Sequence, residues 1–192
     1  MLIDSISKTI SQKMLDASII PIEDKDIYYY GLQLIVSTII KGMGLMAIAL
    51  LFDKAIEAMI FIGVFGVLRI NAGGFHLDTY FKCFVVTSAS MMLCIWIGST
   101  IPLSLIPYII TCCLVITTLL ILLYAPVDNP NRPLNGNEHK KFRIRSLNAI
   151  IFLAIVIISL YFLKLELHRY ICIASLAILF EGITLLPVWK SL

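Results

Sequence analysis

The chain has 192 residues, of which 60% are hydrophobic and 14% are charged, and its formal net charge is +3. Because charged residues make up about a quarter of an ordinary soluble domain, this composition excludes a soluble globular protein. The charge is also too small, and basic residues are too rarely interleaved with aromatic ones, for nucleic-acid binding, so we expect no nucleic-acid partner.

Long apolar stretches separate short polar segments along the whole sequence. Lipid cannot hydrogen-bond exposed backbone groups, so the chain must cross a bilayer as helices. The pattern predicts an all-α, polytopic membrane helical bundle that forms a single domain over residues 1–192. We expect about six transmembrane helices between residues 32 and 187, preceded by an amphipathic helix.

Residues 1–22 show the periodicity of an amphipathic helix. Apolar residues recur at steps of three and four, with polar residues on the opposite face, at Ile3, Ile6, Ile10, Met14 and Ala17. Such a helix suits the membrane surface. A helix packed against the rest of the protein is an equally good interpretation, and Pro21 is expected to end the helix in either case.

Six apolar runs are expected to cross the bilayer, at residues 32–52, 55–68, 84–101, 105–124, 147–163 and 169–187. The second run has only 14 residues and would cover roughly 21 Å as a helix, less than the ~30 Å hydrocarbon core. It must therefore continue into neighbouring residues, thin the bilayer or lie beside a cavity.

Three charged residues, Lys41, Glu57 and Glu181, lie within these runs. An unpaired charge in lipid is costly, so we expect a buried pair of Lys41 with Glu181 or with Glu57. The same residues are compatible with the path of a small peptide transporter. The chain, however, shows no internal repeat of the kind that many transporters have.

Basic residues are distributed unevenly between the two sides of the predicted membrane. Eleven of the fifteen lysines and arginines fall on the side of the N-terminus and three on the other. The eleven are Lys8, Lys13, Lys25, Arg69, Lys82, Arg132, Lys140, Lys141, Arg143, Arg145 and Lys190. Positive residues favour the cytoplasmic side, so both termini and residues 69–83 are expected there.

Residues 69–83 form a polar segment between two apolar runs, with Arg69, His76 and Cys83 at equal steps of seven. A cysteine attacks as its thiolate, which a nearby imidazole favours by accepting the proton. On one continuous helix, seven residues would separate His76 and Cys83 by about 10 Å, too far for a hydrogen bond. We therefore expect the helix to break at Gly73 and Gly74, whose bare N–H groups would also suit an oxyanion.

Simpler interpretations of the same residues remain. His76 is equally compatible with an interfacial position, Cys83 with inert packing and Arg69 with a topology anchor. The cysteines and histidines have no metal-ligand spacing, so we expect neither a metal nor another cofactor. Four further cysteines lie in apolar runs and are expected to be inert, namely Cys94, Cys112, Cys113 and Cys172.

Two motifs together resemble the accessory gene regulator B (AgrB) family. The first motif consists of Arg69, Gly73, Gly74, His76 and Cys83. The second is Tyr-Ala-Pro-Val-Asp at residues 124–128 with Asn-Arg-Pro at residues 131–133, followed by a basic segment. The resemblance extends over the whole length, including the amphipathic start and the number of spans.

This resemblance implies a cysteine endopeptidase of the bacterial cell membrane, which processes a quorum-sensing propeptide, AgrD, into a cyclic thiolactone or lactone. It implies that Cys83 is the nucleophile and His76 its general base. Arg69 would be a further required residue of undefined role. It also suggests a homodimer.

On this interpretation, Cys83 attacks the carbonyl carbon of the last ring residue and releases the acidic C-terminal tail of the propeptide. The propeptide's own cysteine or serine then captures the resulting thioester. A basic run on the same predicted side, Lys140, Lys141, Arg143 and Arg145, is a candidate binding site for the acidic tail. Ordinary positive-inside anchoring explains these residues equally well. A membrane sensor module without catalytic activity is a further alternative, but it leaves the Gly-Gly-His and cysteine pattern unexplained.

Overall fold

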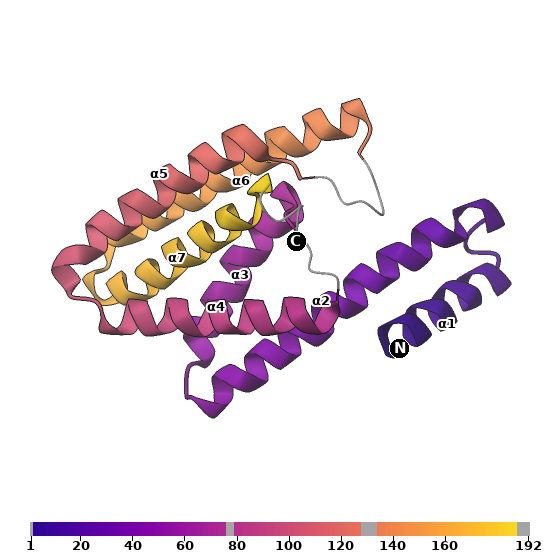
Figure 1. Ribbon diagram of the computed structural model, residues 1–192, viewed down its shortest axis with the longest axis horizontal. Coiled ribbons are helices and arrows are strands. Elements are labelled where there is room, and N and C mark those ends of the chain that lie inside the picture. Colours follow the sequence, from indigo (N-terminus) through magenta and orange to yellow (C-terminus); the bar gives the residue numbers. More distant parts are fainter. Residues whose placement is uncertain (1, 76–78, 128–133, 188–192) are drawn as a thin grey trace. The chain divides into compact units, whose positions relative to one another are not determined.

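The structure is a computed structural model that describes residues 2–75, 79–127 and 134–187. These residues form an all-α membrane bundle, as predicted (Figure 1). The helices are α1 (Leu2–Asp16), α2 (Lys25–Leu51), α3 (Ala55–Ala72), α4 (Tyr80–Thr100), α5 (Ile106–Tyr124), α6 (Gly136–Leu163) and α7 (His168–Thr184). Three short 3-10 helices precede α2, α5 and α7, at Ile22–Asp24, Leu103–Leu105 and Leu165–Leu167.

Five of the helical segments in the described part of the chain are long and apolar enough to cross a membrane. They are Ile22–Leu51, Ala55–Ala72, Tyr80–Thr100, Leu103–Tyr124 and Gly136–Leu163. The sixth expected span is α7, whose 17 residues cover only about 25 Å. Nine of its residues are buried, so neighbouring helices rather than lipid surround much of α7.

The predicted short second span is longer than the apolar run. Helix α3 continues through residues 69–72 and reaches 18 residues, which is the first of the three predicted alternatives. Helix α6 likewise starts at Gly136, eleven residues before the apolar run, because Asn135 and Glu138 form a capping box there. The basic run therefore occupies the first turns of a membrane-crossing helix.

The described residues group into two compact units, and the first comprises residues 1–48. Within it, α1 and α2 are joined by hydrogen bonds from Gln33 to Asp4 and from Lys25 to Gln12, each 2.7 Å long. Two serines of α1, Ser7 and Ser11, are fully buried. Helix α1 ends at Asp16, five residues before Pro21.

The outward face of α1 in this unit carries part of the predicted apolar stripe. Ile6 and Ile10 are each 37% exposed, whereas the buried positions are the small polar Ser7 and Ser11. Ile6 and Ile10 are therefore not buried within this unit, whereas Ile3 and Met14 of the same stripe are partly buried. This arrangement favours the prediction that Ile6 and Ile10 face a membrane surface.

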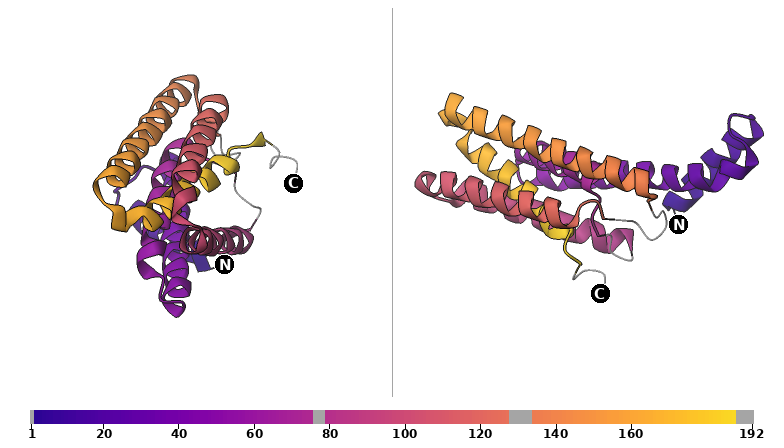
Figure 2. Two further views of the ribbon diagram at one scale, coloured as in Figure 1. Left: turned by 90° about the vertical axis from the view of Figure 1, so that its left-hand side faces the viewer. Right: turned by 90° about the horizontal axis from the view of Figure 1, so that it is seen from above.

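The second unit comprises residues 49–192, and α7 lies at its centre. Helix α7 contacts α3, α4, α5 and α6, and Figure 2 shows it running among them. Its side chains, together with those of α3, α5 and α6, form one continuous apolar core. A hydrogen bond of 2.8 Å from Ser146 on α6 to the carbonyl oxygen of Asn71 links the end of α3 to the same core.

The structure corrects the predicted pairing of the intramembrane charges. Glu57 pairs with Lys54 at 3.0 Å, across the turn that begins α3. Glu181 pairs with Arg69 at 3.5 Å. Each carboxylate thus has a basic partner other than Lys41. Sequence spacing cannot show which helices are neighbours, and Glu181 faces the end of α3.

Candidate catalytic site at the end of α3

The site begins where α3 stops. The N–H group of Gly73 donates to the carbonyl oxygen of Arg69 at 3.1 Å, and the backbone then turns with φ of +75° at Gly73 and +133° at Gly74. Side chains other than hydrogen rarely tolerate this left-handed region, so the turn requires glycine. The next helix, α4, starts at Tyr80. The predicted break between Arg69 and Cys83 is therefore confirmed.

The segment after α5 closes against this turn. The N–H group of Val127 donates to the carbonyl oxygen of Ala72 at 3.0 Å, and Val127 forms a parallel bridge with Gly73. A Cβ atom at Gly73 would lie 2.5 Å from the Val127 carbonyl oxygen, closer than such atoms approach in proteins. The two motifs of the sequence, at residues 69–83 and 124–128, therefore meet in the fold.

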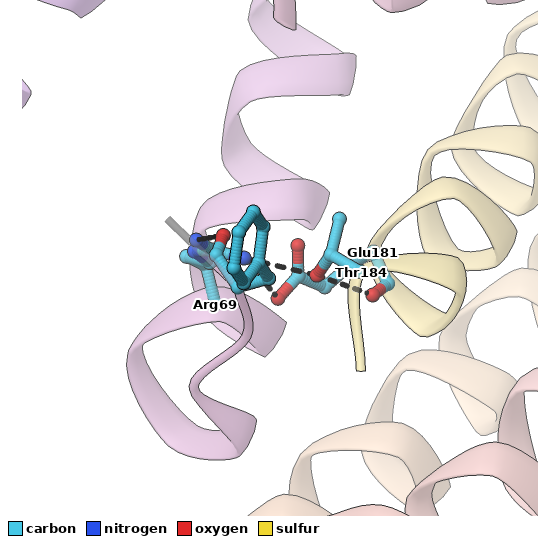
Figure 3. A network of polar contacts seen from close by, with 4 residues as sticks. Arg69, Glu181 and Thr184 are labelled. Carbon is cyan, nitrogen blue, oxygen red and sulfur yellow. Dashed lines mark hydrogen bonds and ion pairs between the residues drawn. The ribbon is translucent and has the colours of Figure 1, made fainter. Parts of the chain in front are cut away.

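Arg69 connects α3, α7 and the turn (Figure 3). Its Nη1 atom donates to Thr184 Oγ1 at 2.9 Å and lies 3.5 Å from Glu181 Oε1. Its Nη2 atom donates to the carbonyl oxygen of Phe75. The Arg69 side chain is only 17% exposed and that of Glu181 only 1%. These contacts make Arg69 a cross-link inside the bundle and not simply a topology anchor.

The turn consists of Gly73, Gly74 and Phe75, and Phe75 is hydrogen-bonded through both its N–H group and its carbonyl group. The N–H group of Phe75 donates to the main-chain oxygen of Thr184 at 3.0 Å, while its carbonyl accepts from Arg69. A Cβ atom at Gly74 would overlap the Arg69 guanidinium and lie 2.5 Å from Thr184 Oγ1. Glycine at position 74 therefore provides both the backbone angle and the space for the cross-link.

Cys83 lies in the first turn of α4 and is partly exposed. Its N–H group donates to the carbonyl oxygen of Thr79 at 3.1 Å. Thr79 caps the helix, because its hydroxyl oxygen accepts from the N–H group of Lys82 at 3.2 Å. The cap thus fixes the start of the helix that carries the Cys83 thiol.

The predicted general base, His76, and its neighbour Asp78 lie outside the described residues. The distance between His76 and Cys83 therefore stays a prediction. The other four cysteines are free thiols within apolar helices, three of them buried and Cys112 exposed. Cys83 differs from all of them because it lies in the first turn of its helix.

The basic run is exposed along the first turns of α6. Arg143 donates to the carbonyl oxygen of Leu122 near the end of α5 at 3.1 Å, and the Arg145 guanidinium lies 5.6 Å from the centre of the Phe142 ring. These two arginines thus have roles within the protein. Lys140 and Lys141 are the residues of the run that are better placed to bind a partner.

Sequence reasoning missed Thr184, which bonds both Arg69 and Phe75. The available signal was its position three residues after the buried Glu181, because residues three apart share one face of a helix. It also missed Val127 as the partner of Gly73. Neither position carries a charge or a reactive group that would single it out.

Comparison with known proteins identifies the family of the chain. The family model of accessory gene regulator B matches residues 3–185. An AgrB-like protein of Clostridium perfringens (strain SM101) is 30% identical over 173 residues, which cover 84% of this chain and 79% of the relative. Accessory gene regulator protein B of Staphylococcus haemolyticus is 29% identical over 160 residues, covering 83% of this chain and 80% of the relative.

No solved structure is significantly similar to the fold described above. The family assignment therefore depends on sequence, and both motifs of the sequence fall within the matched range. The match covers nearly the whole chain, including the α3 turn, Cys83 and the Arg69 partners on α7. The chain belongs to the accessory gene regulator B family.

Proposed function

We propose that this protein is a membrane cysteine endopeptidase that processes a quorum-sensing propeptide, with Cys83 as nucleophile and His76 as general base. One observation carries the proposal. The helix breaks at Gly73 and Gly74, and a new helix begins with Cys83 in its first turn. His76 thereby belongs to the connection between two helices and is not separated from Cys83 by two turns of one helix.

The role in quorum sensing is supported by the family. The relative from Staphylococcus haemolyticus is named as an accessory gene regulator protein. The proposed substrate is an AgrD-like propeptide with an acidic C-terminal tail and an internal cysteine or serine. We also propose that the protein lies in the cytoplasmic membrane of a bacterium and acts as a homodimer. Both termini and the site would face the cytoplasm, where a thiol stays reduced.

The reaction would proceed in two acyl transfers. His76 accepts the proton of the Cys83 thiol, and the sulfur attacks the carbonyl carbon of the last ring residue. Collapse of the tetrahedral oxyanion breaks the peptide bond, and the imidazolium returns its proton to the amine of the departing tail. The propeptide's own thiol or hydroxyl then attacks the Cys83 thioester. This second step closes the ring and restores the Cys83 thiol.

Capture by an internal thiol exchanges one thioester for another, so the second step is nearly balanced in free energy. Water competes for the same thioester and would give an open peptide. A site beside the ends of membrane-crossing helices limits access of water to the acyl-enzyme. The hydrogen bonds from Phe75 to Arg69 and Thr184 support such a site. They satisfy the N–H and carbonyl groups of Phe75 within the protein, so these groups do not need water as a partner.

The alternative function, peptide transport without cleavage, loses much of its support. It relied on Lys41, Glu57 and Glu181 as charges lining a path. Glu57 pairs with Lys54, and Glu181 is 1% exposed and pairs with Arg69. Transport also requires a sealed membrane, whereas a peptidase can act in detergent. This difference provides the test.

The test uses purified protein in detergent micelles with a synthetic propeptide that has a central cysteine and an acidic tail. We expect cleavage, and we expect His76→Ala to slow it by about 10²- to 10⁴-fold because the proton acceptor is lost. The matched control is His139→Ala, which changes an exposed histidine at the start of α6. Absence of cleavage by the wild-type protein, or equal rates for His76→Ala and the control, would contradict the proposal.

The exposed lysines of α6 give a second expectation. Replacing Lys140 and Lys141 together by glutamine should raise KM for the propeptide by about 5- to 10-fold and leave kcat within about twofold, because a surface charge aids capture and not chemistry. The effect should shrink as salt is added. The control replaces Lys8 and Lys13, also exposed, by glutamine and removes the same charge. An equal rise in KM for the control would rule out a local binding site.

A further inference from the structure

Burial of the Glu181 carboxylate lowers the stability of this fold. Glu181 is 1% exposed on the central helix α7, and its only ionic partner in the described part of the chain is Arg69, at 3.5 Å. Its second carboxylate oxygen, Oε2, is buried and has no hydrogen-bond partner among the described residues. A buried charge that is only partly satisfied destabilises a protein relative to an apolar residue of the same size. Its presence calls for a reason other than stability.

Glu181 and Thr184 are three residues apart on α7, so they lie on one face of that helix. The Thr184 hydroxyl donates its proton to the Glu181 main-chain oxygen at 2.8 Å. The hydroxyl is therefore left to act as an acceptor toward Arg69, whose Nη1 lies 2.9 Å away. The Glu181 carboxylate attracts the Arg69 guanidinium through its charge, and the Thr184 hydroxyl fixes its direction through a hydrogen bond. Together they orient the guanidinium (Figure 3).

Phe75 is hydrogen-bonded through both of its backbone polar groups, one to α7 and one to Arg69 of α3. The Phe75 N–H group donates to the Thr184 main-chain oxygen, and its carbonyl accepts from Nη2 of the oriented Arg69. A carbonyl group shares one rigid plane with the nitrogen and Cα of the next residue. The direction of the Phe75 carbonyl therefore sets the direction in which the chain leaves Phe75.

We propose that Glu181 and Thr184 are positioning residues for the proposed peptidase. Acting through Arg69, they fix the Phe75 carbonyl and thereby place the general base, His76, relative to Cys83. This inference rests on the proposed function, and it assigns a role to Arg69 that the sequence leaves undefined. It also explains why a poorly satisfied carboxylate is kept inside the bundle.

A purely structural ion pair would have different consequences. Its loss would lower the stability of the bundle and reduce the amount of folded enzyme, but kcat per folded enzyme molecule and KM would both stay unchanged. A positioning pair acts on the chemical step, because small displacements of a catalytic group cost up to about 10²-fold in rate. Its effect also requires the group that it positions, so it should vanish when His76 is absent.

Two near-isosteric variants separate these possibilities. Glu181→Gln keeps the shape of the side chain and removes its charge. Thr184→Val keeps the volume and removes the acceptor for Arg69. The matched control is Ser175→Ala on the same helix, because Ser175 is also fully buried and its hydroxyl bonds only the Ile171 carbonyl oxygen. If Glu181→Gln does not accumulate as folded protein, Thr184→Val, which leaves every charge in place, carries the test.

The experiment measures propeptide cleavage and, separately, the rate at which iodoacetamide alkylates Cys83, in full-length protein carrying Cys112→Ala. We expect Thr184→Val and Glu181→Gln to lower kcat by about 10-fold or more with KM within about twofold. Both should slow alkylation of Cys83 by a similar factor, and Thr184→Ser should recover most of the wild-type rate. Ser175→Ala should change neither rate.

The decisive arm combines Thr184→Val with His76→Ala. We expect the double variant to be alkylated at the same rate as His76→Ala alone. Equal slowing by Thr184→Val in the presence and absence of His76 would overturn the inference, as would an unchanged kcat in folded Thr184→Val. Alkylation does not depend on the propeptide, so failure of cleavage by the wild type would refute the proposed function and leave this test readable.

Discussion

Replacing Cys83 by alanine is expected to reduce propeptide cleavage by at least about 10³-fold, because the reaction then lacks the atom that forms the acyl-enzyme. The variant should fold normally. The Cys83 side chain is only partly buried, and α4 is started by the Thr79 cap and not by the thiol. Cleavage of the propeptide by purified protein, together with the yield of folded protein, is the measurement.

The four other cysteines provide the controls for this variant. Cys112→Ala changes an exposed thiol, and Cys94→Ala and Cys172→Ala change buried ones. All three should cleave the propeptide at near the wild-type rate, although the buried pair would lose some stability from the small cavities that alanine leaves. If cleavage survives Cys83→Ala but fails in one of these controls, Cys83 is not the nucleophile and the assignment is wrong.

Gly74→Ala is expected to lower the cleavage rate by at least about 10²-fold, nearly as much as Cys83→Ala. The φ angle of +133° at Gly74 disfavours any Cβ atom, and that atom would overlap the Arg69 guanidinium and crowd Thr184 Oγ1. Arg69 would have to leave its partners, and Phe75 would lose the bond to its carbonyl. The turn that leads into His76 would then be free to adopt other directions.

The matched control for that variant is Gly66→Ala in α3. A Cβ atom added at Gly66 would have no atom within 4 Å apart from its chain neighbours and the nearby backbone of its own helix. Alanine favours helix over glycine by roughly 0.5–1 kcal/mol. Gly66→Ala should therefore be active and slightly more stable. Cleavage rates and thermal unfolding in detergent distinguish the two. A fully active Gly74→Ala would show that the cross-link at the end of α3 does not govern the site.

Much of the fold could be predicted from the sequence because lipid leaves few choices. Apolar runs of sufficient length must be helices, and extension was one of three options for the 14-residue run, which does extend through residues 69–72. The break after α3 could also be predicted, because Gly73-Gly74 interrupts a helix. Features of this kind depend only on residues that are close together in the sequence, so they can be predicted from it.

Contacts between distant helices could not be predicted in the same way. The buried Glu181 was recognised, but its partner is Arg69, 112 residues away, and not Lys41. Thr184 has the appearance of an ordinary polar residue near a helix end. Arg143 likewise belongs to a basic run, and only the packing of α5 beside α6 shows that it bonds the Leu122 carbonyl. These roles depend on which helices are neighbours.

The most direct measurement of the central claim is the detection of the acyl-enzyme itself. Purified protein would be mixed with a propeptide whose internal cysteine is replaced by alanine, so that no group can close the ring. Mass spectrometry of the Cys83-containing peptide should then show the propeptide fragment attached, and hydroxylamine should remove it as it cleaves thioesters. A wild-type protein that releases the acidic tail without any adduct on Cys83, or an adduct on another cysteine, would contradict this account.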